Sequence, residues 1–239
     1  MIGGVAEIAL EFLGRGGKRL RPRLCKAVFL RCGGVGSLDA ICDAVECFHK
    51  ASLVHDDIQD GDEERYGRPT VWKEHGVPLA IAVGDWLVAH GYQMICDSGF
   101  VAVPKMLRAA VASHMRLCEG QGDDIMSQVK PCQGGPRSVA VDGRAGSPLP
   151  AAFQTYLSIC ERKTGEAFAL AAQLGALAAG ADDAPFRQYG LSYGILFQIN
   201  DDLADDDCDA VRRTGLLELK RKYEDETAFH RDQCAIGVW

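Results

Sequence analysis

Apolar residues recur at intervals of three and four along most of the chain, a spacing typical of helices that bury one face. Alternation at every second residue, which is typical of strands, is scarce. We therefore expect an all-α fold, in which residues 1–239 form a single-domain bundle of roughly ten helices around a central apolar cavity. The clearest stretches are residues 8–13, 40–52, 79–95, 101–117, 167–179 and 186–203.

Two segments depart from this pattern. Residues 130–150 are rich in glycine and proline, so we expect a mobile loop between two helical blocks. Residues 216–233 are mostly charged, with i,i+4 pairs such as Glu218 and Lys222, and this predicts an exposed helix that closes the fold or borders a dimer. The chain ends soon afterwards, at Trp239, so we expect a shortened C-terminal end.

Composition excludes several classes of protein. A net charge of −7 leaves no basic surplus to neutralise phosphates, so we expect no nucleic-acid partner. No stretch has the pattern of a signal peptide or approaches a membrane span, so we expect no transmembrane segment and a cytoplasmic location. The ten cysteines form no C-x-x-C pair, and reduced thiols acting as small buried hydrophobes are the favoured interpretation.

Two aspartate clusters share one design. Each reads D-D-x-x-D at the polar end of an apolar helical stretch, the first over residues 56–60 and the second over residues 201–205. The first and fifth positions on a helix differ by about 40° in azimuth, so Asp56 and Asp60 share a face, as do Asp201 and Asp205. Two such faces opposed across a cavity would form a site for divalent metal and a diphosphate.

Magnesium suits these clusters best. Mg²⁺ binds oxygen, and in proteins it usually takes one or two carboxylates together with phosphate oxygens of a substrate. Mn²⁺ is the alternative, whereas Ca²⁺ is disfavoured because the chain has no EF-hand loop. A lone D-D-x-x-D is more often a solvated helix end, but a second copy favours a functional site.

Basic residues beside glycines predict a phosphate site. Residues 16–23 read G-G-K-R-L-R-P-R, and glycine lets the backbone approach an anion while arginine donates forked hydrogen bonds to phosphate. Arg65 adds a cation beside the first cluster, and Lys163 with Thr164 adds a cation and a hydroxyl at the start of a predicted helix. A basic turn alone is common, so the combination carries the argument.

These motifs together resemble those of the trans-isoprenyl diphosphate synthase (polyprenyl synthetase) family. The resemblance runs from about Gly16 to Asp205. The following motifs occur in family order: G-G-K-R-L-R-P, L-V-H-D-D-I-Q-D, R-Y-G-R-P-T, V-G-D-W-L, the stretch from Glu119 to Asp124, K-T-G-E and F-Q-I-N-D-D-L-A-D. The fold that it implies is an isoprenoid synthase-like helical bundle.

The resemblance also implies a role for each matching position. As catalytic residues it marks Asp56, Asp57, Asp60, Lys163, Asp201 and Asp202. As contacts to the isopentenyl diphosphate head group it marks Lys18, Arg21 and His49. As contacts to the allylic substrate it marks Arg65, Lys163, Thr164 and Gln198. As Mg²⁺ ligands it marks Asp56, Asp60, Asp201 and Asp205.

The implied reaction condenses an allylic diphosphate with isopentenyl diphosphate to give a longer trans-polyprenyl diphosphate, and members of the family pair as homodimers. Product length would depend on residues just before the first cluster. Ala51 and Ser52 are small and leave a tunnel open, and Phe48 is the candidate floor, so we expect geranylgeranyl diphosphate or somewhat longer. Simple core packing explains Phe48 about as well.

Two departures from the family pattern keep alternatives open. Tyr66 stands where the family has the second of two arginines; Arg68 is the nearest substitute. After the second cluster the family's lysine- and glycine-bearing segment is not recognisable, which leaves Arg212 or Arg213 as the diphosphate contact. A weakly active or silent regulatory subunit is therefore one alternative, and a terpene cyclase another. Intact aspartates in both clusters favour a synthase over a regulatory subunit. The all-aspartate composition of the second cluster favours a synthase over a terpene cyclase.

Overall fold

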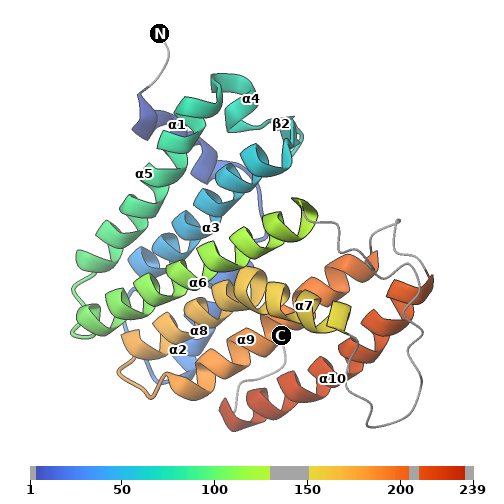
Figure 1. The fold of residues 1–239 in the computed structure, drawn as a ribbon. Coiled ribbons are helices and arrows are strands. Elements are labelled where there is room, and N and C mark those ends of the chain that lie inside the picture. The colour runs from blue at the N-terminus through green and yellow to red at the C-terminus, as the bar shows by residue number, and fades with distance from the viewer. Residues whose placement is uncertain (1–3, 130–150, 205–209, 235–239) are drawn as a thin grey trace. The chain divides into compact units, whose positions relative to one another are not determined.

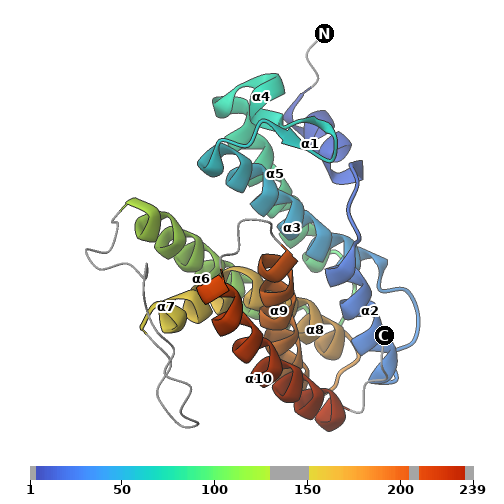
Figure 2. The ribbon, with the colours of Figure 1, turned by 90° about the vertical axis from the view of Figure 1, so that its right-hand side faces the viewer.

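A computed structural model of the chain describes residues 4–129, 151–204 and 210–234. These residues form ten α-helices, one π-helix and one short hairpin (Figures 1 and 2). The all-α prediction is confirmed. The predicted loop at residues 130–150 lies outside the described residues.

The chain separates into two compact units, which we describe one at a time. Unit 1 comprises residues 1–108 and 177–181, and unit 2 comprises residues 109–176 and 182–239, so the boundary falls within the helix α6 (Val103–Val129). The prediction of one domain over residues 1–239 stays a prediction.

Unit 1 is built around two long helices that pack together, α3 (Asp39–Asp60) and α5 (Val77–Cys96). Helix α1 (Val5–Gly14) packs on both, α2 (Leu20–Arg31) packs on α3, and α4 (Val71–His75) lies just before α5. Their apolar faces meet in one core cluster that includes Phe12, Cys47, Val54 and Leu87. The predicted stretches at 40–52 and 79–95 are the centres of α3 and α5.

Glycines allow α5 to approach α3 closely. A Cβ atom built on Gly84 would lie 2.2 Å from His55 Nε2, and one built on Gly91 would lie 2.7 Å from Phe48 Cε1. No real side chain tolerates such separations, so these two glycines determine how closely the helices pack. The position of His55 and Phe48, and of the α3 turn between them, depends on this contact.

A hairpin follows the first aspartate cluster. Strands β1 (Glu64–Arg65) and β2 (Arg68–Pro69) pair antiparallel, with Arg65 opposite Arg68. The two turn residues both have positive φ, 56° at Tyr66 and 72° at Gly67, which is the pattern of a type I′ turn. The Asp62 carbonyl anchors this segment because it accepts hydrogen bonds from Thr70 Oγ1 (2.9 Å) and Trp72 Nε1 (2.8 Å).

Unit 2 contains the remainder of α6, then α7 (Ala151–Cys160), the π-helix η1 (Glu161–Gly165), most of α8 (Glu166–Ala178), α9 (Ala184–Ala204) and α10 (Ala210–Cys234). Its core cluster includes Cys160, Ile199, Leu216 and Leu219, from α7, α9 and α10. The backbones of η1 and α9 lie close together, because a Cβ on Gly194 would lie 2.8 Å from Gly165 Cα. Helix α10 begins six residues before the predicted charged helix, and only its inner face is buried.

Contrary to the expectation from the sequence, helix α5 is long and apolar enough to span a membrane, by length and composition alone. Its run of Val, Leu, Ile and Ala is interrupted by one carboxylate, Asp85. Core helices of water-soluble proteins pass the same test, and about a third of the apolar window is buried inside the unit. The result alone is therefore weak support for a membrane segment.

Candidate active site

The first aspartate cluster forms the last turn of α3. Asp56 is partly exposed, Asp60 is exposed, and Gly61 ends the helix with a φ of 73°. Carboxylates are unfavourable at a helix C-terminus, where the helix dipole is negative, and this last turn of α3 carries no basic residue. Asp56 and Asp60 therefore gain from a bound cation.

Asp57 points elsewhere and has a different partner. It is fully buried, and Arg65 of β1 donates to its Oδ1 at 2.5 Å. Burial raises the pKa of Asp57 in spite of this arginine, and its Oδ2 is buried with no hydrogen-bond partner. Burial alone would lower the pKa of Arg65, but the bond to Asp57 and the charges of Asp57, Tyr66 and Asp62 together outweigh burial and raise that pKa. The pair thus connects the hairpin to α3.

The two predicted residues of the basic segment, Lys18 and Arg21, differ in their surroundings. Lys18 is exposed, whereas Arg21, in the first turn of α2, lies 3.3 Å (Nη1 to Nε2) from His49 of α3. Burial, and then the charges of Arg21 and Lys50, lower the pKa of His49 to about 2. The imidazole is therefore neutral, and its Nε2 accepts the hydrogen bond from Arg21.

Arg21 stays a cation at neutral pH. Burial lowers its pKa to about 10, with Glu46 acting in the opposite direction. A neutral histidine that accepts from an arginine orients the guanidinium without neutralising it, so the charge is kept for an anion. The structure thus brings together Arg21 and His49, two of the residues predicted to contact isopentenyl diphosphate.

The second cluster ends α9, in unit 2. Asp201 is exposed, and Asp202 accepts hydrogen bonds from Tyr156 Oη (2.6 Å) and Gln198 Nε2 (2.9 Å). Thr164 Oγ1 donates to Gln198 Oε1 at 2.7 Å, so three predicted residues lie in one hydrogen-bonded chain. Burial, with Cys160 and Asp202 nearby, raises the pKa of Tyr156, which therefore remains a donor. Asp205 lies outside the described residues.

Lys163 lies on the π-helix η1, a rare element that is frequent at functional sites. Its Nζ is 2.8 Å from Asp124 of α6, and the neighbouring Arg162 is 2.5 Å from Asp123. The π-helix packs closely on α6, because a Cβ on Gly120 would lie 2.8 Å from the Arg162 carbonyl carbon. The predicted stretch from Glu119 to Asp124 therefore packs beside Lys163.

The three predicted chain-length residues do not share one environment. Phe48 packs edge-on against Tyr92, with ring centroids 5.0 Å apart. Ala51 is buried in the core cluster of unit 1, whereas Ser52 is exposed and donates to the His49 carbonyl. Phe48, Ser52 and Asp56 follow one another at four-residue spacing along α3. Their role in chain length stays a prediction.

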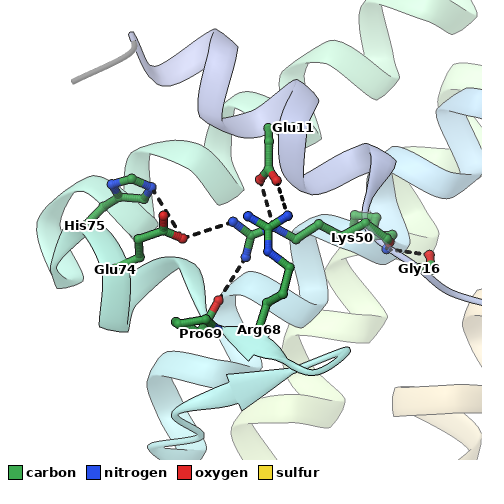
Figure 3. Close-up of polar contacts among 8 residues, drawn as sticks. Glu11, Gly16, Lys50, Arg68, Pro69, Glu74 and His75 are labelled. Atoms are coloured by element: carbon green, nitrogen blue, oxygen red, sulfur yellow. Dashed lines mark hydrogen bonds and ion pairs between the residues drawn. The ribbon is translucent and has the colours of Figure 1, made fainter. Parts of the chain in front are cut away.

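Two of the proposed substitute cations, Arg68 and Arg213, have a partner. Arg68 Nη1 lies 2.5 Å from Glu11 of α1 (Figure 3), and Arg213 Nη2 donates to the Leu203 carbonyl at 3.2 Å. The side chain of Arg212 lies outside the described residues. Arg68 is therefore engaged with α1 in the structure, and its role as a substitute for an arginine at position 66 stays a prediction.

Sequence reasoning missed two polar residues. Lys50 of α3 is fully buried, and Glu166 at the start of α8 accepts hydrogen bonds from Ser113, Arg116 and Arg187. Both had a signal in the sequence: Lys50 interrupts an apolar face, and Glu166 completes the K-T-G-E motif. Neither could be assigned a partner without the tertiary structure.

Within the described ranges, no three His, Cys, Asp or Glu residues are grouped closely enough to bind a metal ion by themselves. Each aspartate cluster therefore offers hard oxygen donors that need further ligands, such as phosphate oxygens, to complete a coordination sphere. The clusters lie in different units, so their predicted opposition stays a prediction.

Residues 4–212 match the polyprenyl synthetase family. The chain belongs to this family. Among curated relatives it is similar to geranylgeranyl diphosphate synthases of Cereibacter sphaeroides (34% identical over 206 residues, 82% of this chain) and Mycobacterium tuberculosis (36% over 196 residues, 80% of this chain). It spans only 62% and 51% of their lengths.

Solved structures of polyprenyl synthetases agree with the fold. The geranyltranstransferase of Thermotoga maritima superposes with a TM-score of 0.79 at 23% identity, covering 98% of this chain and 85% of the other. A Helicobacter pylori geranyltransferase, solved with magnesium and isoprenyl diphosphate, gives 0.76 at 20% identity, covering 96% and 81%. The predicted isoprenoid synthase-like fold is confirmed.

Proposed function

We propose that this polyprenyl synthetase is a prenyltransferase that condenses an allylic diphosphate with isopentenyl diphosphate to give a longer trans-polyprenyl diphosphate. One observation carries the proposal: in a member of this family, both D-D-x-x-D clusters end long helices, where carboxylates gain from bound cations. Named relatives that act as geranylgeranyl diphosphate synthases support the same reaction.

Magnesium is the proposed metal. Asp56 and Asp60 offer hard oxygen ligands on one face of α3, and Asp201 offers another at the end of α9. Too few carboxylates gather at either place to bind an ion alone, which suits Mg²⁺ because it takes phosphate oxygens of a substrate as further ligands. When bound, Mg²⁺ neutralises charge that develops on the departing diphosphate.

The side chains of the chain itself then have the following roles. Arg21, oriented by the neutral His49, and the exposed Lys18 bind the diphosphate of isopentenyl diphosphate. Lys163 binds the diphosphate of the allylic substrate, Gln198 contacts the same diphosphate, and Thr164 lies near the carbon chain. These cations stabilise negative charge on the leaving group.

The proposed reaction needs no side-chain base to accept a proton. The allylic carbon–oxygen bond breaks and diphosphate leaves with the electron pair. The double bond of isopentenyl diphosphate then forms the new carbon–carbon bond, and a proton passes from the resulting cation to the released diphosphate. No described residue is required to take that proton.

The product is proposed to be geranylgeranyl diphosphate or somewhat longer, because Ser52, four residues before Asp56, is small and exposed. Replacing Phe48 by Ala tests the position of the floor. We expect longer products, separated by chromatography, since removal of the ring opens space beside Gly91. Unchanged product length would show that the floor lies elsewhere.

Location and assembly are further proposals. The eight cysteines of the described ranges are in no disulfide, which supports a reducing compartment such as the cytoplasm. A homodimer is proposed because members of the family form one, and light scattering on the purified protein would measure it.

Turnover decides among the alternatives. Purified protein is incubated with Mg²⁺, an allylic diphosphate and labelled isopentenyl diphosphate. An elongated diphosphate supports the proposal, and chelation of Mg²⁺ should abolish it. A hydrocarbon product would indicate a cyclase, and turnover only with a partner chain would indicate a regulatory subunit. Asp60→Asn should lower kcat by at least about 10²-fold, the order expected when an electrostatic contact to the transition state is lost.

A further inference from the structure

Three segments of unit 1 meet at the buried ammonium of Lys50. The linker between α1 and α2 supplies the carbonyl oxygens of Arg15 and Gly16, α3 supplies Lys50 itself, and the hairpin turn supplies the ring of Tyr66. We refer to Lys50, Tyr66 and these two carbonyls as the Lys50 cluster. Figure 3 shows Lys50 reaching from α3 to Gly16, beside the Glu11–Arg68 ion pair.

The contacts of Lys50 use its donors completely. Its Nζ donates to the Arg15 carbonyl and, at 3.0 Å, to the Gly16 carbonyl. The same nitrogen lies 4.3 Å from the centroid of the Tyr66 ring and 5.3 Å from that of Phe12, distances at which a cation is attracted to an aromatic face. With three donors, no exposed surface and these partners, Lys50 does not contact a substrate.

Tyr66 closes the cluster from the solvent side. Its backbone has a φ of 56°, and its ring packs on Gly16, where a Cβ would lie 3.0 Å from Tyr66 Cδ1. A glycine is thus required at position 16 for two reasons: its own φ of 34° and the ring above it. The hairpin turn therefore covers the linker that precedes Lys18.

The linker has no other regular structure. Gly16, Gly17 and Arg19 all have positive φ, with values of 34°, 104° and 48°. Its contacts include the two carbonyls bound by Lys50, the Tyr66 ring, and the exposed ion pair of Arg19 with Asp43 (2.5 Å). An unusual backbone persists only where neighbouring groups fix it, and the Lys50 cluster is the buried part of that support.

We propose that Lys50 and Tyr66 are positioning residues that fix the Gly16–Arg19 backbone, so that Lys18 and Arg21 meet the diphosphate of isopentenyl diphosphate in one geometry. The identity of the substrate in this proposal rests on the proposed function. The contact of Lys50 and Tyr66 with the linker does not depend on it. In this chain the residue at position 66 acts through a ring that packs on a lysine, without contributing a charge of its own.

Hydrogen exchange tests whether Lys50 and Tyr66 fix the linker, and kinetics test whether the fixed linker positions Lys18 and Arg21 for the substrate. The first variant is Tyr66→Leu, which keeps an apolar body on an exposed turn and removes the aromatic face. We expect amide exchange over residues 16–19 of the ligand-free protein to speed up by about tenfold, in keeping with the loss of one modest interaction. We expect KM for isopentenyl diphosphate to rise by a similar factor while KM for the allylic diphosphate stays unchanged.

Further variants separate positioning from general damage. Tyr66→Phe keeps the ring and should restore wild-type exchange and KM. Lys50→Met should have the same effects as Tyr66→Leu, and these effects should be larger because the variant also loses both carbonyl contacts. Lys73→Met is the matched control, since Lys73 also lies over an aromatic ring, that of Trp72 at 5.8 Å, but is exposed and touches no part of the linker.

Each outcome is decisive. Unchanged exchange at residues 16–19 in both Tyr66→Leu and Lys50→Met would overturn the proposal. Faster exchange with unchanged KM for isopentenyl diphosphate would overturn the positioning role. If the wild-type protein showed no turnover, the proposed function would fail, and the exchange data would still decide whether the Lys50 cluster fixes the linker.

Discussion

At the scale of single residues, burial separates aspartates that look equivalent in the sequence. Asp56, Asp57 and Asp60 lie within about one helical turn, yet of these three only Asp57 is buried, and it is ion-paired with Arg65. The face shared by Asp56 and Asp60 could be predicted from helix geometry. The partner of Asp57 could not, because Arg65 reaches it through a hairpin turn that the chain pattern did not reveal.

The Arg65–Asp57 pair leads to a prediction about stability. Arg65→Met should lower the free energy of unfolding at neutral pH by about 3 kcal/mol, because it leaves a buried carboxylate without its cation. Urea denaturation measures this. Arg68→Met is the control: its ion pair with Glu11 is about half exposed on both sides and should contribute about 1 kcal/mol or less. Equal losses in the two variants would contradict the prediction.

At the scale of elements, close helix contacts depend on glycine. In unit 2 the π-helix η1 meets α9 through Gly165 and Gly194, and this contact places Thr164 within 2.7 Å of Gln198. In unit 1, Gly84 and Gly91 do the same for α3 and α5. The contact in unit 2 is between backbones, whereas in unit 1 the side chains of His55 and Phe48 pack on the two glycines.

Gly194→Ala tests the contact in unit 2. The added Cβ would lie 2.8 Å from Gly165 Cα, so η1 must shift, and we expect a loss of about 1–3 kcal/mol in unfolding free energy. The allylic KM should rise as well, since Lys163 and Thr164 lie on η1. Gly122→Ala, in a helix and with nothing within 4 Å of the new Cβ, should instead stabilise by up to about 1 kcal/mol.

The long helices were predictable because each carries its own three-and-four pattern over many residues. The helix α2, the hairpin and the π-helix were not predicted. The sequence at 16–23 suggested a basic turn, and α2 begins inside it at Leu20 because Arg19 enters the left-handed region first. The hairpin has only two residues in each strand, too few for a pattern. A π-helix differs from an α-helix by one hydrogen-bond register, which composition does not encode.

At the scale of the whole molecule, two buried carboxyls make the free energy of unfolding depend on pH in opposite directions. Burial alone would raise the pKa of Glu166, but the hydrogen bonds from Arg116, Arg187 and Ser113 outweigh it and lower that pKa. Its stabilisation is present above the ordinary value of 4.5 and is lost as pH falls below it. Burial raises the pKa of Glu46, so this residue favours the folded state less as pH rises above 4.5.

Glu46→Gln isolates the second effect. Glu46 Oε2 is buried without a hydrogen-bond partner, and an amide removes the titrating charge with little change in size. Relative to this variant, the wild-type protein should lose stability as pH rises from about 4.5 toward neutrality, as measured by thermal unfolding across a pH series. Parallel curves for the two proteins would contradict it.

Site chemistry was more accessible to sequence reasoning than site geometry. The family resemblance assigned Arg21 and His49 to one substrate and Thr164 and Gln198 to the other, and only the structure shows that each pair is in contact. The partners of Lys50 and Glu166 are side chains distant in the sequence, such as Arg116, which lies 50 positions before Glu166, or carbonyl oxygens, which leave no trace in residue identity.

The contact between Tyr66, Lys50 and Gly16 has a consequence for which substitutions the three positions tolerate together. An arginine at position 66 would bring a second positive charge against a buried ammonium, and a side chain at position 16 would meet the ring. The three positions are therefore coupled, so the effect of a substitution at one should depend on the residues at the other two. A gene library that randomises all three together should recover an active arginine at position 66 more often where the lysine has been replaced by an uncharged residue.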